Sequence, residues 1–194
     1  MRFKKGSGLT TTEKLLAELC ERSFLSLWSY PNLFRKAGKE LSDLLVVFGN
    51  DVVIFSDKSC SYPDTGDAAL DWSRWYRRSI ADSAHQIQRA EDWLKKWPDK
   101  IFLDAKCTEP LPIQLPPLGD LRIFRVCVAV GASGRALTET GRRDLRVSAV
   151  VTNDSERLTI GTITTAIGPI HVFDENTLPV VMSNCPRSPI SSTI

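Results

Sequence analysis

The sequence predicts an α/β fold in which helices pack on a mixed β-sheet, and three observations support this class. Apolar residues recur at helical spacing over two long segments, at about 11–28 and 67–96. Two β-branched runs, DLLVVF and DVVIFS, are separated only by Gly49 and Asn50, and more strand-like runs follow Pro98. With 194 residues, 42 % of them apolar, the chain can bury one good core, so we expect a single domain over residues 1–182.

The first helix is predicted by the segment TTTEKLLAELCERSFLSLW. Thr10 and Glu13 have the spacing of a capping box, in which each side chain bonds the backbone N–H of the other residue. We therefore expect a helix from about residue 11 to 28. The following segment, SYPNLFRKAGKE, predicts a connecting loop because its proline, asparagine and glycine break the pattern.

A hairpin follows, and its turn fixes which residues share a face. Gly49 and Asn50 have the length and chemistry of a two-residue turn. With this turn, Asp43 stands directly opposite Ser56, and Lys58 lies on the same face within reach of both. Both strands are apolar nearly throughout, as expected of strands that are covered on both faces.

A second helix is predicted from Asp67 to Lys96, where Pro98 stops it. Five later runs predict strands: KIFLDAK, LRIFRVCVAVG, LRVSAVVTN, RLTIGTIT and PIHVFDE. A proline-rich crossing, TEPLPIQLPPLGD, and a polar loop, ASGRALTETGRRD, lie between them. The order of a helix, a hairpin, a helix and then several strands predicts a sheet of mixed strand direction.

Composition excludes several classes of protein. The net charge of +2 is too small to indicate a nucleic-acid partner, so any basic surface must be local. The five cysteines form no CxxC pair, which favours reduced thiols over disulfides or a zinc site. No apolar run follows the basic start MRFKKGSGL, so we expect no signal peptide, no membrane span and a cytoplasmic protein.

The hairpin carries the chemistry needed to hydrolyse a phosphodiester. Carboxylates hold Mg²⁺, the metal neutralises charge on the phosphate, and a lysine orients or activates the attacking water. With Asp43 on one strand and FSDK on the other, after a helix that carries glutamates, the segment resembles the PD-(D/E)XK nuclease superfamily. The branches that look most similar are the Holliday-junction resolvases and the nuclease-related domain.

This resemblance covers about residues 10–97, half the chain, within a core motif of residues 10–106, and implies a restriction-endonuclease-like fold with extra C-terminal strands. It implies a nuclease that depends on Mg²⁺ or Mn²⁺, acts on DNA ahead of RNA, and forms a homodimer, as resolvase-like enzymes usually do. On its pattern, Asp43 matches the first acid, Lys58 the lysine and Glu13 the helical acid. The chain departs from the pattern at the acid of the triplet, where it has Ser56.

Asp57 is one residue off that position, and in a regular strand it points to the opposite face. A β-bulge at Ser56 would rotate Asp57 into the site, which gives Asp43, Asp57 and Ser56 as the candidate metal ligands. Without the bulge, the alternative is a catalytically inactive nuclease fold that binds nucleic acid or a protein partner. A structural or assembly protein with no nucleic-acid role also fits the near-neutral charge.

Three further features bear on function. Candidate phosphate-binding residues on the second helix are Arg74, Arg77 and Arg78, although acids lie among them and a solvated, ion-paired face is the alternative. FLDAK offers a second DxK spacing, Asp104 and Lys106, and ranks behind the hairpin. His85 and His171 are isolated in the sequence, which favours packing over a ligand or general-base role.

The last segment, residues 183–194, has no apolar periodicity and two prolines. This composition predicts an irregular tail. Codons exist for the segment that, translated in the neighbouring reading frame, would encode an amphipathic, helix-like sequence, so a truncated or frameshifted gene is one hypothesis for the tail.

Overall fold

The computed structural model describes residues 10–24 and 28–184, and its central element is a seven-stranded mixed sheet. In chain order the strands are β1 (Ser29–Lys36), β2 (Lys39–Phe48), β3 (Asp51–Ser59), β4 (Arg122–Val130), β5 (Arg146–Val151), β6 (Thr159–Thr165) and β7 (Gly168–Phe173). Across the sheet their order is β1-β2-β3-β4-β7-β6-β5. The pairs β3/β4, β4/β7 and β5/β6 are parallel and the others antiparallel, which confirms the predicted α/β class and mixed sheet.

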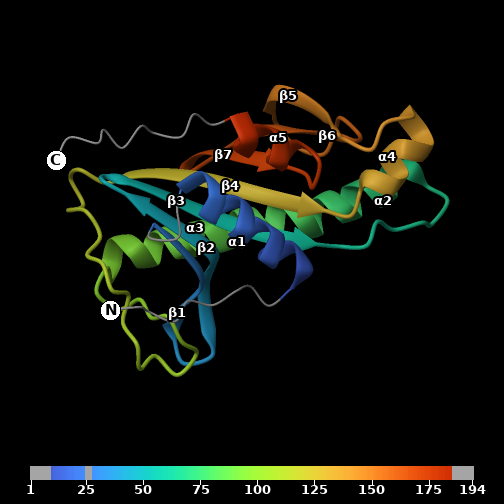
Figure 1. Cartoon of the computed structure of the whole chain (residues 1–194). Helices are drawn as coiled ribbons and strands as arrows, with labels where there is room; N and C mark the ends of the chain where they lie inside the picture. Colours follow the sequence, from blue (N-terminus) through green and yellow to red (C-terminus); the bar gives the residue numbers. More distant parts are fainter. Residues whose placement is uncertain (1–9, 25–27, 185–194) are drawn as a thin grey trace.

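Helices cover both faces of this sheet (Figure 1). They are α1 (Thr11–Phe24), α2 (Ala68–Tyr76), α3 (Asp82–Lys96), α4 (Ser133–Thr140) and α5 (Thr177–Asn184), with a π-helical turn η1 (Arg77–Ala81) between α2 and α3. In the view of Figure 1, α1 and α5 lie in front of the sheet and α2 and α3 behind it. The predicted second helix is confirmed, capped by Asp67, whose carboxylate accepts the N–H groups of Ala69 and Leu70. In the part of the chain that the structure describes, no helix is long and apolar enough to cross a membrane.

The alternation of side chains along β2 and β3 builds two separate apolar cores. Leu45 and Ile54 pack into the larger core with the stacked indoles of Trp72 and Trp75, whose ring centroids are 5.3 Å apart. Leu44 belongs to the smaller core on the other face. Its remaining buried members are Leu16, Val46, Phe55, Val126, Val128, Leu178 and Met182. Burial of each large side chain stabilises the fold by about 1.5–3 kcal/mol, so strands buried on both faces anchor the sheet.

One expectation for the N-terminal third was wrong. The first helix, α1, is described from Thr11 to Phe24, and residues 25–27 of the predicted range lie outside the described residues. The expected loop SYPNLFRKAGKE instead forms β1 and the start of β2. Pro31 fits in β1 because β1 is an edge strand, where a missing backbone N–H costs no sheet hydrogen bond. Proline and glycine therefore marked an edge strand and its hairpin turn at Gly38, where φ is +64°, instead of a loop.

Three later expectations were also corrected. KIFLDAK forms no strand, and only Phe102 makes isolated bridges, to Phe34 and Pro110. The polar loop ASGRALTETGRRD contains α4, which ends at Gly141 with φ +75° and buries Ala136. The boundary expected at residue 182 falls inside α5, and residues 185–194 lie outside the described residues. The strands predicted from the other four runs are confirmed as β4 to β7.

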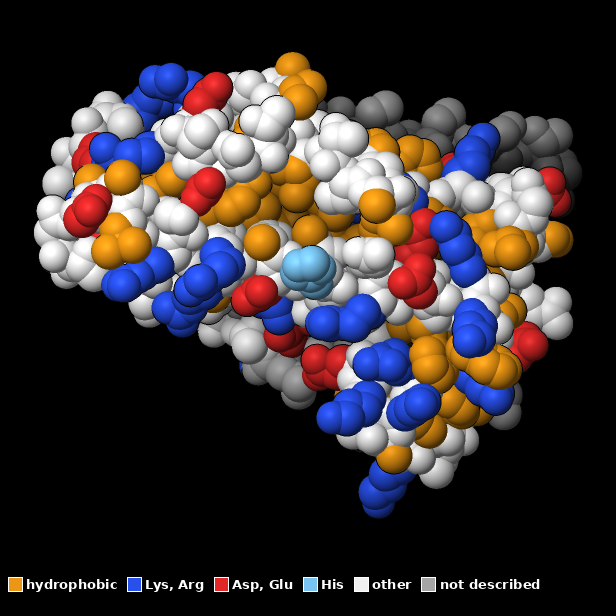
Figure 2. Space-filling view, turned by 180° about the vertical axis from the view of Figure 1, so that it is seen from behind, with side chains coloured by type: hydrophobic (Ala, Val, Ile, Leu, Met, Phe, Trp, Pro, Cys, Tyr) orange, Lys and Arg blue, Asp and Glu red, His pale blue; other side chains and the backbone are white. Residues whose placement is uncertain are grey.

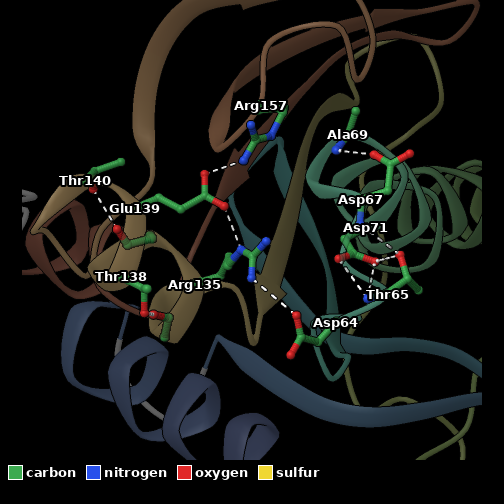
Figure 3. Close-up of polar contacts among 12 residues, drawn as sticks. Asp64, Thr65, Asp67, Ala69, Asp71, Arg135, Thr138, Glu139, Thr140 and Arg157 are labelled. Atoms are coloured by element: carbon green, nitrogen blue, oxygen red, sulfur yellow. Dashed lines mark hydrogen bonds and ion pairs between the residues drawn. The ribbon is translucent and has the colours of Figure 1, made fainter.

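A polar network fastens α4 to its surroundings (Figure 3). Glu139 accepts from Arg135 at 2.6 Å and forms a second ion pair with Arg157, which precedes β6. Arg135 also reaches Asp64 at 3.5 Å, in the loop before α2. The buried carboxylate of Asp71, in the first turn of α2, accepts the backbone N–H of Thr65 in the same loop. These contacts tie the C-terminal strands to the N-terminal half.

Candidate active site

The hairpin opens into a fork at the end where the predicted acid and lysine lie. The register between β2 and β3 is the predicted one, but the paired residues end at Leu44 and Phe55, one pair before Asp43 and Ser56. Beyond this point β2 pairs only with β1, and β3 continues beside β4 as far as Ser59. Where β2 and β3 separate, backbone N–H and C=O groups that face the fork have no partner in the other strand. These groups can form hydrogen bonds with side chains instead.

Asp43 lies at the base of this fork and bridges it. One carboxylate oxygen, Oδ2, accepts the backbone N–H of Asp57 at 2.6 Å, and Oδ1 accepts Nε2 of Gln86 from α3 at 3.1 Å. Burial raises the pKa of Asp43, while the Asp57 N–H and the charge of Lys58 act in the opposite direction. The carboxylate is thus held in one orientation by two different elements.

Ser56 and Lys58 lie on the same sheet face as Asp43, the face covered by α3. The Ser56 hydroxyl donates to Oγ of Ser83 at 3.3 Å in a buried contact with α3. Lys58 lines a pocket with α3 residues and forms no ion pair within 4 Å with a described residue. The ammonium of Lys58 is therefore available to a ligand, whereas the Ser56 hydroxyl is already used.

The β-bulge expected at Ser56 is absent from the β3/β4 ladder, which runs without a register shift from Asp51–Arg122 to Ser59–Val130. Asp57 consequently stays on the α1 face, as the parity of a regular strand requires. Its side chain is only 7 % exposed, and its Oδ1 has no hydrogen-bond partner within the described structure. Burial, with the charges of Asp43 and Glu13, raises the pKa of Asp57 to about 6 against the hydrogen bond from Thr12 and the charge of Lys58.

Glu13 reaches the fork from the start of α1. The predicted capping box is confirmed: the Thr10 N–H donates to Oε2 of Glu13 at 3.3 Å, and the Glu13 N–H donates to Oγ1 of Thr10 at 3.1 Å. The same Oε2 accepts Nδ2 of Asn32 in β1 at 3.1 Å. The negative charge of Glu13 raises the pKa of Asp43 and Asp57, so the glutamate belongs electrostatically to the same cluster.

The carboxylates of the fork suit an open Mg²⁺ site better than a closed cage of protein ligands. Among the described residues, no group of three or more His, Cys, Asp or Glu side chains is arranged to hold a metal ion. Mg²⁺ is commonly bound by one or two carboxylates, with substrate phosphate and water completing its shell. Asp43 supplies one carboxylate for this second arrangement on the face of Lys58, whereas Asp57, with its unpartnered Oδ1, lies on the α1 face and could add a second one only across the open fork.

A pocket of about 510 Å³ opens beside Lys58 and brings in residues that the sequence pattern did not identify. His85, Gln86 and Arg89 line it from α3, together with Arg78 from the π turn. The positions 82, 85, 86 and 89 have helical spacing, so α3 presents them on one face. Of the three arginines predicted to contact nucleic acid, Arg78 lines this pocket, whereas Arg74 and Arg77 do not.

The second DxK spacing serves a local structural purpose. Asp104 accepts the backbone N–H groups of Lys106, Thr108 and Glu109 at 2.7–3.0 Å and so organises the loop after α3. Phe102 of that loop bridges to Phe34 in β1. Since β1 is the edge strand and β2 separates it from β3, the loop is not next to β3. His171 is placed in β7, where its Nδ1 lies 3.1 Å from the hydroxyl of Thr162.

Comparisons with models of known protein families, with curated protein sequences and with solved structures gave no match. The chemistry of the fork must therefore be inferred from its own geometry.

Proposed function

We propose that this chain is a nuclease that hydrolyses phosphodiester bonds with the help of Mg²⁺ or Mn²⁺. The proposal depends mainly on the fork between β2 and β3. There, the buried Asp43 shares a face with Lys58, and a second buried carboxylate, Asp57, has an oxygen without a partner. The sequence resemblance to the PD-(D/E)XK superfamily points to Asp43 and Lys58, with Ser56 at the position of the triplet acid and Asp57 one residue off, and it makes DNA the expected substrate ahead of RNA.

Each side chain has a role that follows from its surroundings. Asp43 would hold the metal ion, and Asp57, which lies on the opposite face of β3, would join it only across the open fork. The ion when bound neutralises charge on the phosphate. Gln86 keeps the Asp43 carboxylate turned toward the fork. Lys58 would orient the attacking water and stabilise the negative charge that develops on the phosphate oxygens. Hydrolysis adds this water to phosphorus and breaks the bond to the leaving oxygen, which takes up a proton.

The test is cleavage of plasmid DNA, single-stranded DNA and RNA in the presence of Mg²⁺, Mn²⁺ or EDTA. We expect cleavage that depends on the metal and falls by about 100-fold or more in Lys58→Ala, as loss of one stabilising group commonly does. Lys106→Ala is the matched control, since it removes a lysine from the exposed DxK loop. Equal cleavage by the Lys58 variant and the wild type would reject the assignment.

Two observations favour a second candidate, a catalytically inactive fold that binds nucleic acid. The strand β3 lacks the bulge at Ser56 that would turn Asp57 into the site. The hydroxyl of Ser56 stands where the resemblance calls for an acid, and it is buried against Ser83. A neutral hydroxyl is a much poorer Mg²⁺ ligand than a carboxylate. Binding of nucleic acid that persists in EDTA, with no product at any metal concentration, would identify this candidate.

A further inference from the structure

A second pocket continues the one beside Lys58. This pocket has a volume of about 300 Å³ and is lined by Arg35, Glu40 and Leu41, together with Gln86 and Arg89. The last two residues also line the first pocket, so the two recesses meet over α3. Gln86 at this junction holds the carboxylate of Asp43. The two recesses are therefore adjacent along α3 and form a groove beside Asp43 of the proposed active site.

Cations follow the length of this groove. We call it the arginine groove, formed by Arg78 and Lys58 at one end, Arg89 at the junction and Arg35 at the other end. Asp82 and Glu40 are the carboxylates among its lining residues, so cations outnumber anions. Figure 2 shows this side of the molecule, with Lys and Arg side chains gathered over its lower part. Clustered cations of this kind, and not the small net charge, are what binding to a chain of phosphates requires.

Aromatic rings continue the path beyond Arg35. The guanidinium of Arg35 lies 5.5 Å from the ring centroid of Trp93, and the rings of Trp93 and Trp97 are 6.4 Å apart. Trp97 is 39 % exposed, and Nζ of Lys100 lies 4.2 Å from its ring centroid. An exposed indole beside cations at the end of a cationic groove has the composition of a site for stacking nucleic-acid bases.

We infer that the arginine groove binds an unpaired strand of nucleic acid and that Trp97 stacks on one of its bases. Recesses of 510 and 300 Å³ have the size of small-ligand sites and accept a few nucleotides. Readout of bases in a duplex needs a helix or ribbon that protrudes into its major groove, whereas a recessed cationic groove beside an exposed indole suits an unpaired strand. The inference takes from the proposed function only that the ligand is nucleic acid, and it specifies single-stranded substrate.

The test measures binding without catalysis. A labelled DNA strand of about 16 nucleotides, and the duplex of the same sequence, are titrated by fluorescence anisotropy in EDTA at several salt concentrations. We expect the strand to bind more tightly than the duplex. Arg89→Gln should weaken strand binding about tenfold and lower the slope of log K against log salt by about 0.7. Arg143→Gln, which removes the same charge from the exposed loop before β5, should leave both unchanged.

Trp97→Leu supplies an independent readout. It should weaken strand binding several-fold with no change in the salt slope, and abolish part of the quenching of tryptophan fluorescence by the strand. The inference is overturned if the duplex binds as tightly as the strand, or if Arg89→Gln behaves like Arg143→Gln. If the strand binds as expected but is not cleaved, the inference stands and the nuclease is rejected. If cleavage needs Lys58 but not Arg89, the nuclease stands and the inference is rejected. Circular dichroism of each variant checks that the exposed substitutions leave the fold intact.

Discussion

Asp57 allows the electrostatics of the fork to be tested without any assumption about substrate. Its carboxylate is buried and one oxygen lacks a partner in the described structure. Burial is the largest cause of the shift in its pKa, from 3.8 to about 6. The Asp57→Asn variant removes the charge while keeping the size of the side chain, so it mimics the protonated acid.

The sign follows from the direction of the shift. A carboxyl group whose pKa is raised by folding stabilises the fold in its protonated form; this contribution is complete below pH 3.8 and is lost as the pH rises through 6. At pH 8 the charged Asp57 lowers the free energy of unfolding by about 3 kcal/mol, and at pH 4.5 by about 1 kcal/mol. The advantage of Asp57→Asn over the wild type should therefore be about 2 kcal/mol larger at pH 8 than at pH 4.5.

Urea unfolding of both proteins at the two pH values measures this difference. The comparison between pH values cancels any cost of the asparagine amide that does not depend on pH. A difference of this size also corresponds to about 4–8 °C in Tm for a chain of this length. If Asp57→Asn changes stability equally at pH 8 and pH 4.5, the carboxylate is solvated and the account of the fork given above is wrong.

Three further substitutions test the fold around the site. Glu91→Gln should lower the free energy of unfolding by about 3 kcal/mol, because the nearly buried Arg125, 2.6 Å from Glu91, loses its charged partner. Urea unfolding measures this loss, and replacing both residues by leucine should recover part of it. Gly131→Ala should cost at least about 2 kcal/mol, since φ is +114° and a Cβ would lie 2.1 Å from the carbonyl oxygen of Cys60; an unchanged Tm would contradict this. Thr10→Ala should cost about 1 kcal/mol in thermal unfolding through loss of the capping box, and cleavage should persist if Glu13 acts on the fork through its charge alone.

Local patterns in the sequence were sufficient for much of the architecture. The register of the hairpin followed from a two-residue turn, and the second helix followed from apolar spacing that ends before Pro98. The capping box of Thr10 and Glu13 was also predicted correctly. These features depend on residues that are close in sequence, so their energetics can be deduced before the fold is known.

The candidate site was only partly predictable. The side chains of Asp43 and Lys58 share a face because parity along a strand is a local property. Pairing of β2 with β1 and of β3 with β4 separates the two hairpin strands. The opening of the fork, the regular strand at Ser56 and the burial of Asp57 all depend on this pairing. No pattern within the hairpin contains that information.

The sequence by itself determined the α/β class, the hairpin register and the pair of charged residues that face α3. Only the tertiary structure decided that SYPNLF is an edge strand, that His85, Gln86 and Arg89 join Lys58, and that two adjacent recesses share Gln86 and Arg89. The physical reason is that turns and periodicity act over a few residues. Edge position, burial and the convergence of charges are set by contacts between segments that are far apart in the chain.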